Sequence, residues 1–581
     1  MTFCSYTFQV NCSYQRPSIP SKVQDVKVSI SSALNPLSRD LVHFPIVAAD
    51  IPKAIKETSF KLLDAFVDLV FEFVDQPLLP SQSNFAPVEE IGEAVLVTTV
   101  EGKIPDDFPE GVYIRNGSNP LFGGLKSTKS IFGKSSHVWI EGEGMLHALY
   151  FTKEKGRGTW NIFYNNKHVR TDTFKMEKDG KKPGFLPAIE GDSPAILVAY
   201  ILNGLRFGME NKYLSNTNIF EHSKKYYSIA ENHMPQEIDI SSLETLGNWN
   251  IDGAWDRPFT SHPKKAPGTG ELVIMGIYPR KPYFELGVIS ADGKKMVHKV
   301  DLKFNRCSLC HEIGVTQKYN VIMDFPLTID INRLFMGDSL IKYDKDGYAR
   351  IGVMPRYGDA NSVKWFEVQP CCVLHLVNCF EDNDEVVVRA CRASESVLPR
   401  QQSFKGSKEI SSAENNNEYS DEPFFVHVCE WRLNMRTGEV KEKNATTEFS
   451  MEFPMINEKF VGLRNKFGYL QVVDLEASSI SEGLAKYGGL AKLHFQEYEE
   501  LVEVEYHMFP KGTFCSGATF VPKTQGTDED DGWVVTFTHN ETTNVSQVYV
   551  VDAKSFATQP VAIITLSSRV PYGFHGAFMP L

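Results

Sequence analysis

Several features are scarce in this chain of 581 residues, and each absence narrows its class. Its ten cysteines are few for the length and follow no disulfide framework, so we expect reduced thiols, mostly in strands. No apolar run reaches the roughly 18 residues that a membrane span needs, and no secretory signal is visible. No fixed-period repeat appears, which argues against a WD40-type array.

Positively charged residues are fewer than negatively charged ones. The net charge is −13 and the pI about 5.7, with no basic stripe interleaved with aromatic residues. Because phosphate contacts need clustered Lys and Arg, this composition argues against a nucleic-acid partner. The apolar content of 42% and the charged content of 23% are ordinary for a globular protein that buries a large core.

The first 45 residues differ from the rest, because they are rich in serine and contain few acids, with Asp25 and Asp40 both late in the segment. This composition is typical of an organelle transit peptide and predicts a plastid location. The alternative is a disordered tail that carries no address, in which case the protein would be cytoplasmic.

From about residue 93 the chain consists of short runs of Val, Ile, Phe and Tyr between Gly, Asn, Asp and Pro. Examples are AVLVTTV, GVYIRNG, HVWIEG, LVIMGIY and WVVTFTHN. About 24 to 28 such strands over some 480 residues are too many for a sandwich. They predict an all-β propeller of six or seven four-stranded blades.

Two helical segments interrupt this pattern. In residues 50–76 polar positions recur in steps of three and four, with Asp50 as the candidate N-cap. We predict an amphipathic, membrane-associating helix within 50–80, although packing on the domain would explain the same pattern. Residues 193–209 are apolar on most sides and predict either a core helix or a second lipid-facing patch. Residues 400–423 are polar and predict a solvated loop.

Four of the fifteen histidines lie in unusual surroundings. They are His262 in FTSHPK, His311 in CHEIGVT, His375 inside the apolar run CCVLHLVNCF, and His575 in PYGFHGAF. A buried imidazole must pair both nitrogens or bind a metal. Their separations of 49, 64 and 200 residues do not resemble the ligand pairs of zinc fingers. They suit ligands that come one from each blade and converge on a propeller axis.

Two further motifs allow other interpretations. Residues 306–311, RCSLCH, contain the C-x-x-C-H of a haem attachment site, and Cys307, Cys310 and the Cys371/Cys372 pair are candidate zinc ligands. Residues 141–147, EGEGMLH, resemble a phosphate loop but lack the Lys-Ser/Thr and the following helix, so we predict a tight turn between strands.

Several separated blocks resemble one family in the same order. They are FPEGVYIRNGSNPLF (108–122), HVWIEGEGMLHALYF (137–151), VKWFEVQPCCVLHLVNCFED (363–382), MEFPMIN (451–457) and RVPYGFHGAF (569–578). Together they resemble the carotenoid cleavage dioxygenases of the carotenoid oxygenase family, over about 85–581. The amphipathic helix before them also resembles the plant members, among them the nine-ten cleaving enzymes and the zaxinone synthases.

The resemblance implies a seven-bladed propeller at 85–581 with a helical cap. It also implies a catalytic non-haem Fe(II), or Fe(2+), held by His262, His311, His375 and His575. Four neutral imidazoles would leave two positions of the iron open for O2. The implied reaction inserts both oxygen atoms across one C=C bond of a carotenoid or apocarotenoid and gives two carbonyl fragments. His311 then belongs to this quartet rather than to a haem.

The family also orients its histidines with three glutamates. Two of them match Glu231 and Glu452, whereas the third falls at Gly517 in CSGATFVPK. Leu374 and Phe574, which precede two ligands, should face the iron and wall a substrate tunnel. Because carotenoids partition into membranes, peripheral membrane association through the N-terminal helix would bring the tunnel entrance to its substrate.

The resemblance leaves the reaction open in two respects. Cleavage at the 9,10 (9',10') bond and cleavage at the 13,14 bond of an apocarotenal, as in zaxinone synthase, are both compatible with the sequence. Members that isomerise or cleave another alkene, such as a stilbene, are an alternative. A non-catalytic lipid-binding propeller that has lost its metal is another.

Overall fold

The computed structural model describes residues 53–154, 158–394, 396, 425–495 and 502–580. The predicted transit segment 1–45, the N-cap Asp50 and the predicted loop 400–423 lie outside the described residues. The chain divides into two compact units, 1–58 and 59–581. The second unit carries almost all of the described structure.

The predicted N-terminal helix is shorter than its sequence pattern. Helix α2 (Lys53–Val70) ends within the stretch 50–76, and β1 (Glu72–Asp75) follows and pairs antiparallel with β5 (Lys126–Ser130). Hydrogen bonds to β5 hold residues 72–75 in a strand although their sequence has helical periodicity. The pairing depends on residues distant in sequence, so the local pattern does not reveal it. Among the described residues, no helix combines the length and apolarity needed to cross a bilayer.

Most of the second unit consists of antiparallel sheets, as predicted. The first contains β2 (Val95–Val97), β8 (Trp160–His168), β7 (Gly144–Lys153), β4 (Gly111–Ser118) and β37 (Gly576–Pro580), in that order. The next contains β10 (Asn218–His222), β11 (Lys225–Ile229), β12 (Gln236–Ile238) and β13 (Thr245–Asn248). The third contains β14 (Lys264–Lys265), β15 (Leu272–Ile277), β16 (Phe284–Ile289) and β17 (Met296–Asp301).

The later sheets follow the same plan. One contains β19 (Gly314–Val315), β20 (Tyr319–Asp324), β23 (Ala349–Pro355) and β24 (Lys364–Val368), and another β25 (Cys372–Asp382), β26 (Glu385–Ala393), β27 (Val426–Asn434) and β28 (Val440–Asn444). The largest runs through β29 (Met451–Met455), β30 (Phe467–Val473), β31 (Tyr487–His494), β33 (Thr513–Pro522), β34 (Gly532–Asn540), β35 (Val545–Asp552), β36 (Ala562–Thr565) and β3 (Thr99–Gly102), with β32 (Glu503–Met508) on β31.

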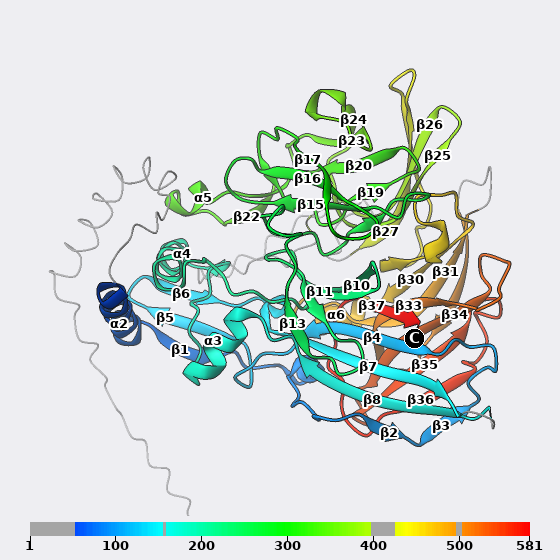
Figure 1. Ribbon diagram of the computed structural model, residues 1–581, viewed down its shortest axis with the longest axis horizontal. Coiled ribbons are helices and arrows are strands. Elements are labelled where there is room, and N and C mark those ends of the chain that lie inside the picture. The colour runs from blue at the N-terminus through cyan, green and yellow to red at the C-terminus, as the bar shows by residue number, and fades with distance from the viewer. Residues whose placement is uncertain (1–52, 155–157, 395, 397–424, 496–501, 581) are drawn as a thin grey trace, which may run out of the picture. The chain divides into compact units, whose positions relative to one another are not determined.

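The leading strands of these sheets form a ring. Strands β4 and β37 contact β10, and then β14 contacts β19, β19 contacts β25, β25 contacts β29, β29 contacts β33 and β33 contacts β37. Between β10 and the residues before β14, Asn218 Nδ2 donates a hydrogen bond of 2.9 Å to the Ser261 carbonyl. Figure 1 shows that the C-terminal strand β37 lies beside β4, so the two ends of the propeller chain share one sheet. This is the arrangement of a β-propeller.

Two small sheets and several short helices lie outside these larger sheets. Strands β1, β5, β6 (Gly133–Ser136) and β9 (Glu190–Gly191) form a small sheet, and β18 (Cys307–Ser308), β21 (Leu327–Ile329) and β22 (Ile341–Tyr343) form another. The helices are α3 (Asp172–Gly180), α4 (Ser193–Phe207), α5 (Asn332–Phe335) and α6 (Leu475–Ile480). Helix α4 corresponds to the predicted 193–209 segment, whereas α3 was not predicted.

One predicted strand is wrong. Residues 137–142, HVWIEG, form the short 3-10 turn η3 (Trp139–Glu141) with its flanking residues. The turn forms because Glu141 Oε2 accepts a hydrogen bond of 2.7 Å from the Val138 backbone N–H, which competes with strand pairing.

Candidate metal centre

The structure brings the four singled-out histidines together. His262 lies just before β14, His311 just before β19, His375 within β25 and His575 just before β37. The Nε2 atoms are 3.0 Å apart between His262 and His311, 3.1 Å between His311 and His375, and 3.1 Å between His375 and His575. All four donor atoms lie within 4.8 Å of one another.

Two carboxylates set the orientation of two imidazoles. His375 Nδ1 donates to Glu452 Oε2 at 2.6 Å, and His311 Nδ1 forms an ion pair with Glu231 Oε1. A proton on Nδ1 leaves a lone pair on Nε2, which faces the other rings. Burial lowers the pKa of His311, but the Glu231 carboxylate outweighs this effect and leaves the pKa above its usual value.

The other two imidazoles are kept neutral. Burial, followed by the neighbouring imidazoles, holds the pKa of His262 and of His575 well below its usual value. Converging lone pairs repel one another unless a cation lies between them. The donor set therefore fits a bound metal ion.

The nitrogen spacing also favours one geometry. Two nitrogens about 2.1 Å from an ion lie about 3.0 Å apart at a right angle and about 3.4 Å apart in a tetrahedron. The observed contacts of 3.0 and 3.1 Å fit the right angle. Imidazole nitrogens are ligands that iron and other first-row transition metals accept.

Strand irregularities direct the site residues inward. The pairing of β25 with β26 is irregular between Val373 and Leu376, which is where His375 lies. The pairing of β29 with β30 is irregular between Glu452 and Met455. A bulge re-aims a side chain that would otherwise alternate with its neighbours, so a histidine in an apolar strand can reach the axis.

Phe453 is a site residue that sequence reasoning missed. It follows Glu452 and has a φ of 53°, in the left-handed region that a phenylalanine rarely adopts. Its ring centroid lies 5.1 Å from that of His375 and 4.7 Å from that of His575. No sequence signal indicates a left-handed phenylalanine, because the conformation follows from the bulge.

Where the resemblance leads us to expect a third glutamate, Gly517 leaves room that the aliphatic part of the Arg115 side chain fills. Gly517 lies where the pairing of β33 with β34 is irregular, with a φ of 71°. A Cβ at this position would lie 2.2 Å from Arg115 Cγ. Arg115 Nη1 donates to Ser516 Oγ at 3.0 Å and to the Pro571 carbonyl, and burial lowers the pKa of Arg115 to about 10. Within the described part of the chain, no carboxylate contacts His262 or His575.

A second missed feature ties three ligand segments together. Lys264, two residues after His262, forms an ion pair with Glu312 Oε1, next to His311. Glu312 Oε2 accepts a hydrogen bond of 2.6 Å from the Leu376 N–H, next to His375. The buried Glu312 carboxylate therefore joins the backbone segments of three histidines.

The two predicted tunnel residues lie near the cluster. Phe574 is buried, and its ring centroid is 5.0 Å from that of Trp139. Leu374 is half-buried beside His375 at the irregular part of β25. A tunnel along these residues stays a prediction.

Within the described ranges, the cysteine motif does not form a metal-binding cluster. Among the described residues, the four histidines are the one group of three or more His, Cys, Asp or Glu side chains that could hold an ion. Burial raises the pKa of Cys307 and of Cys310 to about 12, so both are thiols at neutral pH. All eight cysteines in the described ranges are free and buried, as predicted.

Comparisons with known proteins agree with this site. The family model RPE65, described as retinal pigment epithelial membrane protein, matches residues 85–580. The carotenoid 9,10(9',10')-cleavage dioxygenase 1 of Pisum sativum is 30% identical over 556 residues, which cover 91% of this chain and 95% of that protein. The chloroplastic 9-cis-epoxycarotenoid dioxygenase NCED1 of Oryza sativa subsp. japonica is 29% identical over 544 residues, covering 89% of this chain and 79% of its own.

Solved structures show the same fold. The lignostilbene dioxygenase of Pseudomonas brassicacearum has a TM-score of 0.72 at 21% identity, covering 87% of this chain and 100% of its own. Cobalt-substituted Synechocystis ACO has a TM-score of 0.66 at 20% identity, covering 87% of this chain and 99% of its own. This chain belongs to the RPE65 family, the carotenoid oxygenases, and the predicted membership and propeller fold are confirmed.

Proposed function

We propose that this protein is a non-haem Fe(II) dioxygenase that cleaves a C=C bond of a carotenoid or apocarotenoid into two carbonyl products. The observation that carries the proposal is the convergence of four imidazole Nε2 atoms within 4.8 Å. The relatives named as carotenoid cleavage dioxygenases support the substrate class.

The chain's own residues have distinct parts in this proposal. His262, His311, His375 and His575 would hold the iron, which when bound supplies the site at which O2 is activated. Glu231 and Glu452 keep the protons of His311 and His375 on Nδ1, so that their Nε2 atoms stay available as ligands. Phe453 and Phe574 present apolar surface beside the cluster, which excludes water and suits a hydrocarbon polyene.

The propeller would have seven blades. Five four-stranded units lead from β10 to β32, one begins at β33, and the sheet of β4 and β37 completes the ring. With seven leading strands around an axis, histidines that lie just before or early in four of them can meet at one point. We include residues 85–581 in this catalytic domain.

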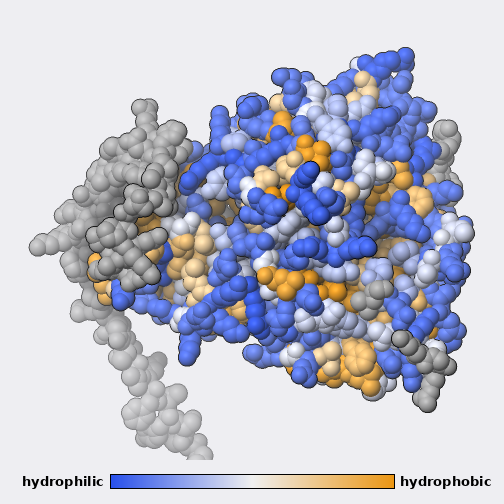
Figure 2. Space-filling view, in the orientation of Figure 1, coloured by the Kyte–Doolittle hydropathy of each residue, from blue (hydrophilic) through white to orange (hydrophobic). Residues whose placement is uncertain are grey.

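Peripheral membrane association is the proposed role of the apolar surface near α2. The exposed side chains are Leu62, Phe66, Leu69, Ile131, Leu205 and Met336, with Leu69 exposed by 85%. Figure 2 shows apolar side chains gathered over the region of β6 and α4, at the left of the view. Large exposed apolar side chains on neighbouring elements are typical of a membrane contact. A plastid location accords with several relatives whose names include chloroplastic.

Cleavage of a polyene panel in oxygen-18 tests the proposed function. Purified protein loaded with Fe(II) should convert at least one carotenoid or apocarotenal into two fragments, each carrying one labelled oxygen. Their masses distinguish cleavage at 9,10 from cleavage at 13,14. The His375→Ala variant should lose both iron and activity. Cleavage of a stilbene alone would refute the substrate class. If the purified protein retained no added Fe(II), the proposal of an iron-dependent dioxygenase would be refuted.

A further inference from the structure

A buried arginine beside the metal centre has no acidic partner. Arg115 lies in β4, opposite Gly576 of β37, and only 1% of the residue is exposed. Its Nη1 donates to Ser516 Oγ at 3.0 Å and to the Pro571 carbonyl, and its Nε is buried without a hydrogen bond. Among the described residues, the acceptors of this guanidinium are neutral oxygens, and no carboxylate forms an ion pair with it.

The guanidinium nevertheless carries its charge at neutral pH. Burial lowers the pKa of Arg115 to about 10, and the phenols of Tyr113 and Tyr164 act in the opposite direction. The Phe537 ring, whose centroid lies 5.5 Å from Cζ, offers a cation–π contact but no negative charge. Buried charges are usually paired with an opposite charge, so the unpaired charge of Arg115 needs an explanation.

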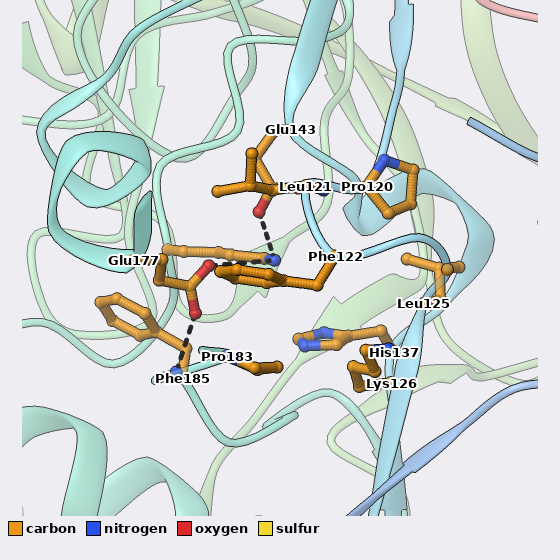
Figure 3. Close-up of a pocket in the computed structure, with 12 residues that line it drawn as sticks. Pro120, Leu121, Phe122, Leu125, Lys126, His137, Glu143, Glu177, Pro183 and Phe185 are labelled. Atoms are coloured by element: carbon orange, nitrogen blue, oxygen red, sulfur yellow. Dashed lines mark hydrogen bonds and ion pairs between the residues drawn. The ribbon is translucent and has the colours of Figure 1, made fainter. Parts of the chain in front are cut away.

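A second buried cation, Lys212, shows the usual arrangement. Its Nζ lies 2.5 Å from Glu143 Oε1 and 3.8 Å from Glu177 Oε2, the two carboxylates that Figure 3 labels. Although burial lowers the pKa of Lys212, the two glutamates outweigh this effect and raise it. The comparison shows that the chain supplies acids to a cation in its core, so their absence at Arg115 is a local feature.

Arg115 lies against the turn that carries His575. A Cβ added to Gly573 would lie 2.6 Å from Arg115 Cζ, so the guanidinium packs on the main chain of this turn. Two residues of extended chain span at most about 7 Å, which places the guanidinium within about 16 Å of His575 Nε2. Glu541 accepts a hydrogen bond of 2.9 Å from the same turn, but it is already paired with Lys486 at 2.8 Å.

The other charges described around the metal centre balance one another. Glu231 and Glu452, which contact two of the imidazoles, offset the two positive charges that a bound Fe(II) would bring. Lys264 is offset by Glu312. With Fe(II) at four neutral imidazoles, Arg115 therefore leaves this buried centre with one net positive charge.

We propose that the unpaired charge of Arg115 keeps the bound iron ferrous by raising its Fe(III)/Fe(II) reduction potential. This proposal rests on the proposed function, because it needs iron at the four histidines. Loss of one electron from Fe(II) to an external oxidant would add a second net positive charge to the buried centre, and repulsion from Arg115 opposes that step. At a distance of about 16 Å or less and an effective dielectric constant of about 20, one charge changes the ratio of Fe(III) to Fe(II) binding by about fivefold or more, which is about 40 mV or more.

A matched pair of variants at Ser516 tests the charge with Arg115 in place. Ser516 Oγ accepts from Arg115 Nη1, and the side-chain oxygen of Ser516→Asp or Ser516→Asn can accept there as well. The two new side chains have the same shape and differ by one negative charge. Redox titration of the iron-loaded proteins with soluble mediators, followed by EPR of Fe(III), should give Ser516→Asp the lower potential by about 40 mV or more. Equal potentials would overturn the proposal.

Two variants of Arg115 separate its charge from its packing. Arg115→Met removes the charge and should lower the potential of the iron by about 40 mV or more relative to the wild type. The control is Arg115→Lys, which keeps the charge and should change the ratio of Fe(III) to Fe(II) binding by about twofold or less. An equal decrease in both variants would assign the effect to packing of the turn and refute the proposal.

Stability of the metal-free proteins distinguishes failure of this inference from failure of the proposed function. An aspartate at 516 would pair with a buried cation that an asparagine leaves unpaired, so the unfolding equilibrium constant in urea should be about tenfold smaller for Ser516→Asp than for Ser516→Asn. Equal constants would show that Arg115 is already neutralised and would overturn the inference even in a protein that binds iron. The expected difference in a protein that retains no iron would refute the dioxygenase instead. The pairs at 115 and 516 are independent, so failure of one pair to fold leaves the other as the test.

Discussion

Two bulged strands lie beside the metal centre and support it in different ways. In β29 the bulge begins after Glu452 and places Phe453 at a φ of 53°, whereas in β33 it begins after Ser516 and places Gly517 at a φ of 71°. The backbones are alike in this respect. The side chain that precedes the left-handed residue is a carboxylate in one strand and a hydroxyl in the other.

This difference decides how each histidine is held. Glu452 accepts from His375 Nδ1 at 2.6 Å, so a hydrogen bond fixes that imidazole. No described carboxylate reaches His575, whose preceding turn is instead fastened by Arg115 through the Pro571 carbonyl and Ser516 Oγ. The comparison teaches that the same bulge supports one ligand through its side chain and the other through packing of the main chain.

Placing a glutamate at position 517 should destabilise the protein more than any other change proposed below. Gly517→Glu adds a Cβ that would lie 2.2 Å from Arg115 Cγ, at a φ that disfavours any side chain. Strain and overpacking of about 1 to 3 kcal/mol each predict a loss of about 2 to 6 kcal/mol in the free energy of unfolding. Urea denaturation measures it.

A second glycine separates these two costs. Gly438 has a φ of 83° and nothing within 4 Å of an added Cβ, so Gly438→Ala reports the backbone strain alone. Gly517→Ala should therefore destabilise the protein more than Gly438→Ala does. Equal losses would show that Arg115 moves aside at no cost, and an increase in iron content for Gly517→Glu would reverse the comparison.

Removing the carboxylate of β29 should have the next largest effect. Glu452→Gln leaves His375 Nδ1 without an anionic acceptor, and loss of such a partner commonly lowers metal affinity by 10- to 100-fold, or about 1.4 to 2.7 kcal/mol. The buried site predicts the upper end of this range. Competition with a chelator measures the affinity. Ser516→Ala in β33 is the matched control and should change it about twofold or less, so similar losses in both strands would abolish the distinction.

Sequence was informative where a residue conflicts with its surroundings. His375 in an apolar strand needed a reason that core packing does not supply. The family resemblance added Glu452, and the structure places both residues at one site. The same resemblance showed that Gly517 stands where the family has its third glutamate. Strand runs such as those of β15 and β34 follow directly from their Val and Ile content.

Features that depend on distant partners were not predictable. Arg115 lies some 400 residues from Gly517 in sequence, and the hydrogen bond to Ser516 spans 401 positions. The left-handed Phe453 and the link from Lys264 to Glu312 likewise require the propeller to be closed first. The predicted helix through residue 76 failed for the same reason, because only β5 reveals that residues 72–75 form a strand.

Glu231, the other carboxylate of the site, shows how burial affects the support of a metal ligand. The Glu231 side chain is exposed by 37% and that of Glu452 by 9%, so water can replace Glu231 more easily. Glu231→Gln should lower metal affinity by about tenfold, at the lower end of the usual range. The chelator competition used for Glu452→Gln measures it under the same conditions. A loss larger than that of Glu452→Gln would mean that burial does not set the strength of this support.

The smallest expected effect concerns the arginine that supports β33. Arg115→Lys keeps the positive charge, but the shorter lysine side chain places its ammonium farther from the Pro571 carbonyl and Ser516 Oγ, which both accept from Arg115 Nη1. Loss of one net hydrogen bond predicts a decrease of about 1 kcal/mol in the free energy of unfolding. Metal affinity should fall by about threefold or less, because His575 Nε2 is held by the turn rather than by Arg115 itself. A tenfold loss of metal with unchanged stability would give Arg115 the role that Glu452 has in β29, and the two strands would then support their histidines in the same way.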